Sequence, residues 1–103
     1  MLEFVSSKLP AVEALCRTHS VKRLELFGSA ACGDFDPARS DLDFVVEFFP
    51  GPSRGLDDPY FRLLLDLEAL FGRKIDLVMA SAIRNPYFRA SVESTKVALY
   101  AAA

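Results

Sequence analysis

The sequence predicts one α+β domain in which helices pack on a small sheet of three or more strands. Helical and extended patterns alternate along the chain instead of falling into separate blocks, which is typical of a sheet covered by helices. The chain has 103 residues, of which 51% are hydrophobic and 25% charged, enough for one apolar core but not for a second domain. We therefore expect residues 1–103 to form a single domain.

Three segments have the alternating pattern of a half-buried strand. The clearest is Leu42–Phe49, where apolar residues occupy every second position and therefore share one face of the strand. Val21–Phe27 alternates less strictly and ends at Gly28, and Lys74–Met79 is short and apolar. Neither the order nor the direction of these strands follows from their patterns.

The remaining regular segments have helical spacing and recognisable ends. Ser6–His19 predicts a first helix capped at Ser6 or Ser7, with Pro10 tolerated in its first turn. A second helix is predicted from a cap at Asp57 or Asp58 to Gly72. A last helix opens at Asn85-Pro86, and its apolar stripe consists of Phe88, Val92, Thr95 and Leu99. We expect a core position for the aromatic residues of these helices: Tyr60, Phe61, Phe71, Tyr87 and Phe88.

Composition excludes several classes of protein. The formal net charge is −2, so the basic surface of a general nucleic-acid-binding protein is missing, and no direct nucleic-acid binding is expected. No apolar run is long enough to span a bilayer, and the beginning of the chain lacks the pattern of a signal peptide. Cys16 and Cys32 form neither a disulfide framework nor a metal-spaced cluster. These observations predict a cytoplasmic protein without membrane contact, and the apolar content leaves homo-oligomer formation open.

Two carboxylates stand at the head of the strongest strand. Asp41 and Asp43 are two residues apart, so in an extended chain they point the same way, roughly 6.5–7 Å apart. An isolated Asp-x-Asp usually reflects a cap and a solvent-facing side chain. Asp43, however, lies within an apolar strand, where a carboxylate is disfavoured unless it is paired or binds a metal. Mg²⁺ prefers carboxylate oxygens together with substrate phosphates, so the spacing suits a metal-bound triphosphate.

Two further features support this interpretation, although each is weak alone. Asp76 interrupts another apolar strand, and a half-exposed strand position would explain it equally well. Gly28-Ser29 follows the first strand, where glycine permits close approach of a ligand and free N–H groups can hold a phosphate. A plain strand-to-helix turn is the alternative for that dipeptide. One shared metal site accounts for all of these features together.

The same residues carry a family resemblance. The run Leu26-Phe27-Gly28-Ser29, then Gly33, then Ser40-Asp41-Leu42-Asp43-Phe44-Val45-Val46, resembles the signature of minimal nucleotidyltransferases of the DNA polymerase β-like superfamily. The resemblance extends over almost the whole chain and is greatest to MntA-like antitoxins, which pair with HEPN-domain toxins. It implies the nucleotidyltransferase fold, with a mixed sheet.

The resemblance also implies roles for individual residues. Asp41, Asp43 and Asp76 would hold two Mg²⁺ ions, and Asp76 would help to activate the attacking hydroxyl. Gly28, Ser29 and Ser40 would bind the nucleotide. The donor would be ATP, and the acceptor a tyrosine hydroxyl of the HEPN toxin. One departure is Cys32, where many relatives have an arginine that faces phosphate.

Three functions remain open at this point. The first is AMP transfer from ATP to a partner toxin, which would make the protein an antitoxin. The second is nucleotide transfer to a small molecule, against which the short chain argues, because such enzymes need additional sequence for the acceptor. The third is a non-catalytic antitoxin that masks its toxin, an alternative motivated by the Cys32 departure.

Overall fold

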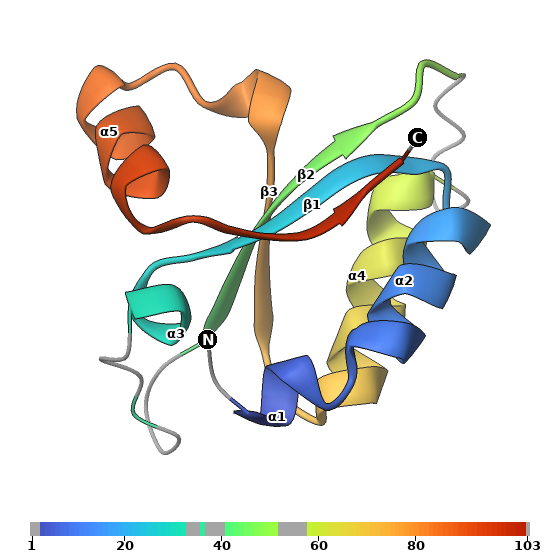
Figure 1. The fold of residues 1–103 in the computed structure, drawn as a ribbon. Helices are drawn as coiled ribbons and strands as arrows, with labels where there is room; N and C mark the ends of the chain where they lie inside the picture. Colours follow the sequence, from blue (N-terminus) through green and yellow to red (C-terminus); the bar gives the residue numbers. More distant parts are fainter. Residues whose placement is uncertain (1–2, 33–35, 37–40, 52–57, 103) are drawn as a thin grey trace.

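The protein forms a four-stranded mixed sheet with helices on both faces (Figure 1). The computed structural model describes residues 3–32, 36, 41–51 and 58–102. The strand order is β3-β2-β1-β4, with β1 antiparallel to both β2 and β4 and β3 parallel to β2. The strands are β1 (Val21–Phe27), β2 (Leu42–Phe48), β3 (Ile75–Met79) and β4 (Val97–Ala101). This arrangement confirms the predicted α+β class.

The helices divide between the two faces of the sheet. They are α1 (Glu3–Ser6), α2 (Leu9–Thr18), α3 (Ser29–Cys32), α4 (Pro59–Phe71) and α5 (Pro86–Thr95), and a 3-10 turn spans Ala80–Ala82. Helices α2 and α4 lie side by side on one face, and α5 lies on the other (Figure 1). None of the helices in the described ranges has the length and apolarity needed to cross a membrane.

The two faces differ in how much apolar surface they bury. On the α2/α4 side, Leu42, Phe44 and Val46 of β2 are completely buried in the main core. On the α5 side a small cluster forms around Val45 and Val92, together with Phe27 and Ile83. The predicted alternation of β2 is therefore confirmed, and it separates a large core from a small one.

Polar side chains cap the first turns of α4 and α5, and a glycine ends α4, as predicted. The Asp58 carboxylate accepts a hydrogen bond of 2.9 Å from the backbone N–H of Tyr60 and caps α4. Gly72 ends this helix in the left-handed conformation, with φ of 63°. Asn85 caps α5 in the same way as Asp58, because its side-chain oxygen accepts from Tyr87 N at 2.8 Å.

The predictions for both ends of the chain need correction. The last helix stops at Thr95, and Leu99 belongs to β4, which pairs with β1. The Val-Ala-Leu-Tyr sequence of β4 suits a strand. The pairing of this segment with β1 outweighs the helical spacing that continues beyond Thr95. The prediction of one continuous helix over Ser6–His19 is also wrong, because two separate helices form at this end of the chain. The Ser6 and Ser7 hydroxyls bond back to carbonyls of α1, and α2 begins separately at Leu9.

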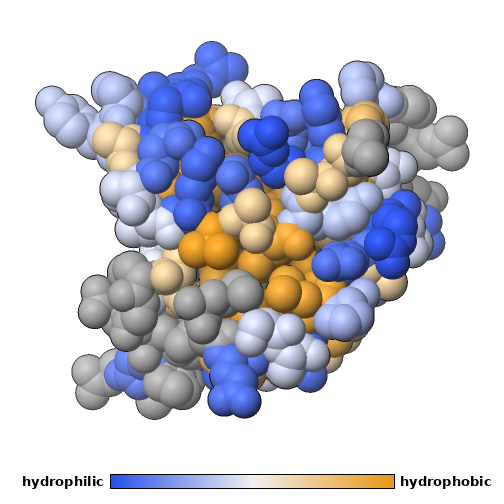
Figure 2. All heavy atoms as spheres, in the orientation of Figure 1, coloured by the Kyte–Doolittle hydropathy of each residue, from blue (hydrophilic) through white to orange (hydrophobic). Residues whose placement is uncertain are grey.

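Several aromatic side chains expected in the core lie at the surface. Tyr87 is 85% exposed and Phe61 46% exposed, and Phe88 is partly exposed beside Phe27. Helical spacing alone does not tell which side of an amphipathic helix faces the sheet. Figure 2 shows that on one face of the molecule apolar residues gather near the crossing of the strands, between α3 and α2.

Candidate active site

Two of the predicted acids face each other across neighbouring strands. Asp43 of β2 and Asp76 of β3 are direct partners in the parallel ladder. Side chains at paired positions project to the same face, which here is the α5 side, because Val45 two residues further along β2 belongs to the α5-side cluster. Asp41 immediately precedes β2 and, like Asp43, is half-buried, whereas Asp76 is exposed.

The electrostatics of Asp43 show that these acids interact. Burial raises the pKa of Asp43 from 3.8 to about 6, and the negative charges of Asp76 and Asp41 and a hydrogen bond with Asp76 add to the rise. A cation near these side chains would offset the repulsion between the carboxylates and lower the pKa of Asp43. Asp43 therefore interacts electrostatically with both other acids, and the three together are called the acid cluster below.

The Gly28 turn lies directly against this cluster. In the ladder between β1 and β2, Phe27 is the partner of Asp43, so the next residue, Gly28, is held beside the acid. Gly28 has φ of 74°, and a Cβ atom placed on it would lie 2.7 Å from Asp43 Oδ2. No larger residue fits here without movement of the carboxylate, so glycine is needed both for its backbone conformation and for its small size.

Both backbone polar groups of Gly28 are hydrogen-bonded. The N–H of Gly28 donates to Thr95 Oγ1 at 3.0 Å, and its carbonyl accepts from Ala31 N at 3.1 Å, where α3 begins. Ser29 starts this short helix. Ser40, the remaining nucleotide-binding candidate, lies outside the described residues, as does the side chain of Cys32.

The donor set fits Mg²⁺ chemically, since hard divalent cations favour carboxylate oxygens. Within the described ranges, however, no three side chains of His, Cys, Asp or Glu are gathered closely enough to hold a metal ion together. Asp41 Oδ2 instead lies 3.7 Å from Lys74 Nζ. The structure thus brings Asp43 and Asp76 together, and the two-metal site remains a prediction.

Two residues near the acids escaped the sequence analysis as site candidates. Lys74 lies beside Asp41, and it stands two residues before Asp76, a spacing that places strand side chains on one face and was visible in the sequence. Thr95 was read only as part of an apolar helix stripe. Its contact with Gly28 joins positions 67 residues apart, so no local pattern indicates it.

The largest cavity among those described lies at the other end of β2. It has a volume of about 780 Å³, and its lining includes Phe48, Phe49, Met79 and Arg89. None of the three acids is among its described lining residues. Cavity size therefore does not mark the acid cluster, which is defined by strand register and charge.

A mixed sheet that presents paired acids beside a Gly-Ser turn defines the nucleotidyltransferase class of domain. Comparison with known proteins agrees, since residues 11–99 match the nucleotidyltransferase domain family. The chain belongs to this family, and the protein is a nucleotidyltransferase.

Relatives of similar length are 34–39% identical to this chain over the aligned residues. "Putative protein adenylyltransferase MJ0128" of Methanocaldococcus jannaschii is 39% identical over 75 residues, which are 73% of this chain and 72% of the relative. A second protein of that organism, "Putative protein adenylyltransferase MJ1379", is 37% identical over 75 residues, or 73% of each chain. A solved structure described as a putative minimal nucleotidyltransferase is 34% identical, covers 92% of both chains and has a TM-score of 0.75.

More distant structures share the fold. A toxin–antitoxin structure with AMP-PNP has a TM-score of 0.70 at 19% identity, covering 91% of this chain and 73% of that chain. A complex of the tri-AMPylated Shewanella oneidensis HEPN toxin with its MNT antitoxin has a TM-score of 0.65 at 16% identity, covering 94% and 72%. At these identities the likeness establishes the fold alone.

Proposed function

We propose that this nucleotidyltransferase transfers AMP from ATP to a tyrosine hydroxyl of a HEPN-domain toxin and thereby acts as its antitoxin. The observation that carries the proposal is the pairing of Asp43 with Asp76 beside the Gly28 turn. A protein acceptor is supported by relatives at 37–39% identity named as protein adenylyltransferases. A HEPN partner is supported by the toxin–antitoxin complexes that share this fold.

The proposed reaction is an in-line displacement at phosphorus. The tyrosine oxygen forms a bond to the α-phosphorus of ATP, and the bond from that phosphorus to the departing pyrophosphate oxygen breaks. Asp41, Asp43 and Asp76 would hold Mg²⁺, two ions in the complete site. When bound, Mg²⁺ neutralises the triphosphate and stabilises the attacking and leaving oxygens.

The residues of the chain have separate tasks in this proposal. Asp76, the exposed member of the pair, accepts the proton of the attacking hydroxyl. Asp43, with a pKa of about 6, is mostly ionised at pH 7 and available as a ligand. Gly28 leaves room beside that carboxylate, and Ser29 and Ser40 contact the phosphates.

The test is mass spectrometry of a HEPN-domain toxin co-expressed with this protein. We expect a mass increase of one or more AMP groups on a tyrosine. Because Asp43 and Asp76 are both required, Asp43→Asn and Asp76→Asn should each reduce transfer by roughly 100-fold or more.

Glu47→Gln provides the matched control, since Glu47 lies on the same strand and face as Asp43 and makes an exposed ion pair with Lys22. This variant should retain transfer. Full transfer by either Asp variant would contradict the proposal. Neutralisation of the toxin without modification would instead identify a masking antitoxin, and Mg²⁺-dependent pyrophosphate release with small alcohols or amines alone would identify a small-molecule enzyme.

A further inference from the structure

The last turn of α5 is tied directly to the turn that follows β1. Thr95 Oγ1 accepts a hydrogen bond from Gly28 N at 3.0 Å and donates one to Ser91 O at 3.0 Å. A hydroxyl has one proton to donate and lone pairs to accept, so a single side chain satisfies both contacts. Through this hydroxyl, the helix and the Gly28 turn are held together.

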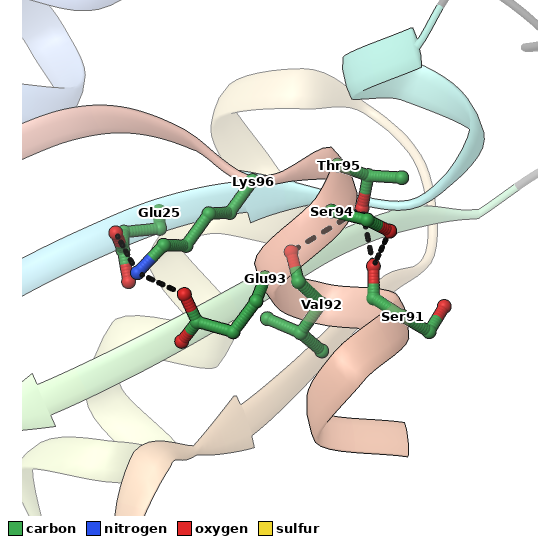
Figure 3. Close-up of polar contacts among 7 residues, drawn as sticks. All are labelled: Glu25, Ser91, Val92, Glu93, Ser94, Thr95 and Lys96. Carbon is green, nitrogen blue, oxygen red and sulfur yellow. Dashed lines mark hydrogen bonds and ion pairs between the residues drawn. The ribbon is translucent and has the colours of Figure 1, made fainter. Parts of the chain in front are cut away.

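The residue after Thr95 anchors the junction between α5 and β4. Lys96 Nζ lies 3.4 Å from Glu25 Oε2 of β1 and 3.0 Å from Glu93 Oε2 of α5 (Figure 3). The Glu25 side chain is only 13% exposed, which limits screening of this pair by water. The end of α5 is thereby fixed to the same strand that leads into Gly28, and Thr95 is held at a defined place.

The position of Gly28 determines the space around Asp43. The turn approaches the carboxylate so closely that an added Cβ would meet Asp43 Oδ2 at 2.7 Å. A small movement of the turn would therefore change the room available to that acid. We propose that Thr95 is a positioning residue of the nucleotide site, holding the Gly28 turn against Asp43. This inference rests on the proposed function, because the site it serves is the site proposed for the nucleotide.

Two substitutions separate the hydroxyl from the rest of the side chain. Thr95→Val keeps the shape but removes the acceptor for Gly28 N, and Thr95→Ser keeps the hydroxyl. Ser94→Ala is the matched control, because the Ser94 hydroxyl donates to the same Ser91 carbonyl at 2.9 Å without the contact to Gly28. Figure 3 shows both hydroxyls directed at Ser91.

The first measurement is the affinity of each variant for AMP-PNP with Mg²⁺ by calorimetry, together with KM for ATP and kcat for AMP transfer. Loss of one hydrogen bond predicts that Thr95→Val binds roughly fivefold to tenfold more weakly and that KM rises by the same factor, with kcat changed less. Thr95→Ser should recover to within about twofold, and Ser94→Ala should match the wild type. A purely structural role would lower the melting temperature without this division between KM and kcat.

The second measurement is hydrogen exchange of the Gly28 amide by NMR, which does not depend on activity. We expect faster exchange in Thr95→Val and wild-type exchange in both Thr95→Ser and Ser94→Ala. If the wild type neither binds AMP-PNP nor transfers AMP, the proposed function fails, and the exchange rates still decide whether Thr95 holds the turn. Unchanged exchange in Thr95→Val, or faster exchange with unchanged KM, would overturn the inference.

Discussion

The two faces of the central sheet differ in what they contribute, although they are formed by the same strands. On the α2/α4 face, Leu42, Phe44 and Val46 of β2 are completely buried and join a core that includes α1, α2 and α4. On the α5 face, β2 presents Asp43, Val45 and Glu47, of which only Val45 is buried. Alternate residues of β2 therefore belong to the apolar core on one face and to the candidate active site on the other.

This difference between the faces explains why a carboxylate in an apolar strand points to a functional site. A strand needs only one apolar face to fold, so the other face is free to carry groups that are unfavourable for stability. Asp43 is such a group, because burial and neighbouring negative charges raise its pKa to about 6. Four experiments test this difference between the faces, beginning with the largest expected effect.

Phe44→Ala tests the stability face. Phe44 is fully buried and is the immediate neighbour of Asp43 in β2. Removal of a buried aromatic ring leaves a cavity and should lower the free energy of unfolding by about 3–5 kcal/mol, measured by urea denaturation. A loss below about 1 kcal/mol would show that the two faces do not differ as described.

Gly28→Ala tests the contact between the turn and the acid. Gly72→Ala is the control, because both glycines have positive φ but a Cβ at Gly72 meets nothing within 4 Å. The control should lose about 1 kcal/mol in urea denaturation from the left-handed conformation alone. Gly28→Ala should lose about 0.5–1.5 kcal/mol more, because the Asp43 carboxylate must turn aside, and Gly28→Ala alone should weaken AMP-PNP binding. Equal losses for the two variants would refute the close contact.

Asp43→Asn tests whether the acid is unfavourable for folding. The folded-state pKa is raised from 3.8 to about 6, so the folded protein holds this proton more tightly than the unfolded chain does. The stability that protonated Asp43 contributes is thus fully present below about pH 4 and is lost as pH rises through about 6. Without divalent metal at pH 7, Asp43→Asn should be more stable by about 1–2 kcal/mol after allowance for solvent screening.

The measurement for Asp43→Asn is urea denaturation between pH 4 and 7 for both proteins. The stability difference should grow across this range and vanish near its acid end. Glu47→Gln should show no such growth. A wild type that is more stable than Asp43→Asn at pH 7 in metal-free buffer would contradict the assignment.

The smallest effect is expected for an exposed ion pair on the same face. Lys22 Nζ and Glu47 Oε1 are 3.4 Å apart, but the two side chains are 55% and 45% exposed. A double-mutant cycle with Lys22→Ala and Glu47→Ala should give a coupling energy below about 0.5 kcal/mol. A coupling above about 1 kcal/mol would mean that charges on this face stabilise the fold, contrary to the comparison.

The sequence predicted those parts of the fold that depend on neighbouring residues. Alternation in β2, the Asp58 and Asn85 caps and the Gly72 terminus are local features, and all were predicted correctly. The end of α5 was predicted wrongly, because the pairing of β4 with β1 is a contact between distant segments that the local helical stripe does not reveal. Contacts between distant segments are equally hard to predict for the candidate site.

For the candidate site, residue types were easier to predict than their arrangement. Asp43 and Asp76 stood out because each interrupts an apolar strand, and the structure pairs them directly. The order of the strands, which creates that pairing, was not readable from either segment alone. The contacts of Thr95 with Gly28 and of Lys74 with Asp41 also required the folded chain.

The pairing of Phe27 with Asp43 has a consequence for how sequences of this kind can vary. The ladder places Phe27 opposite Asp43, so Gly28 stays beside the acid only while β1 and β2 keep this register. A shift of this register by one residue would put a residue other than Phe27 opposite Asp43, and Gly28 would no longer meet the carboxylate. A change of length inside either strand near these residues is therefore expected to displace the turn from the acid.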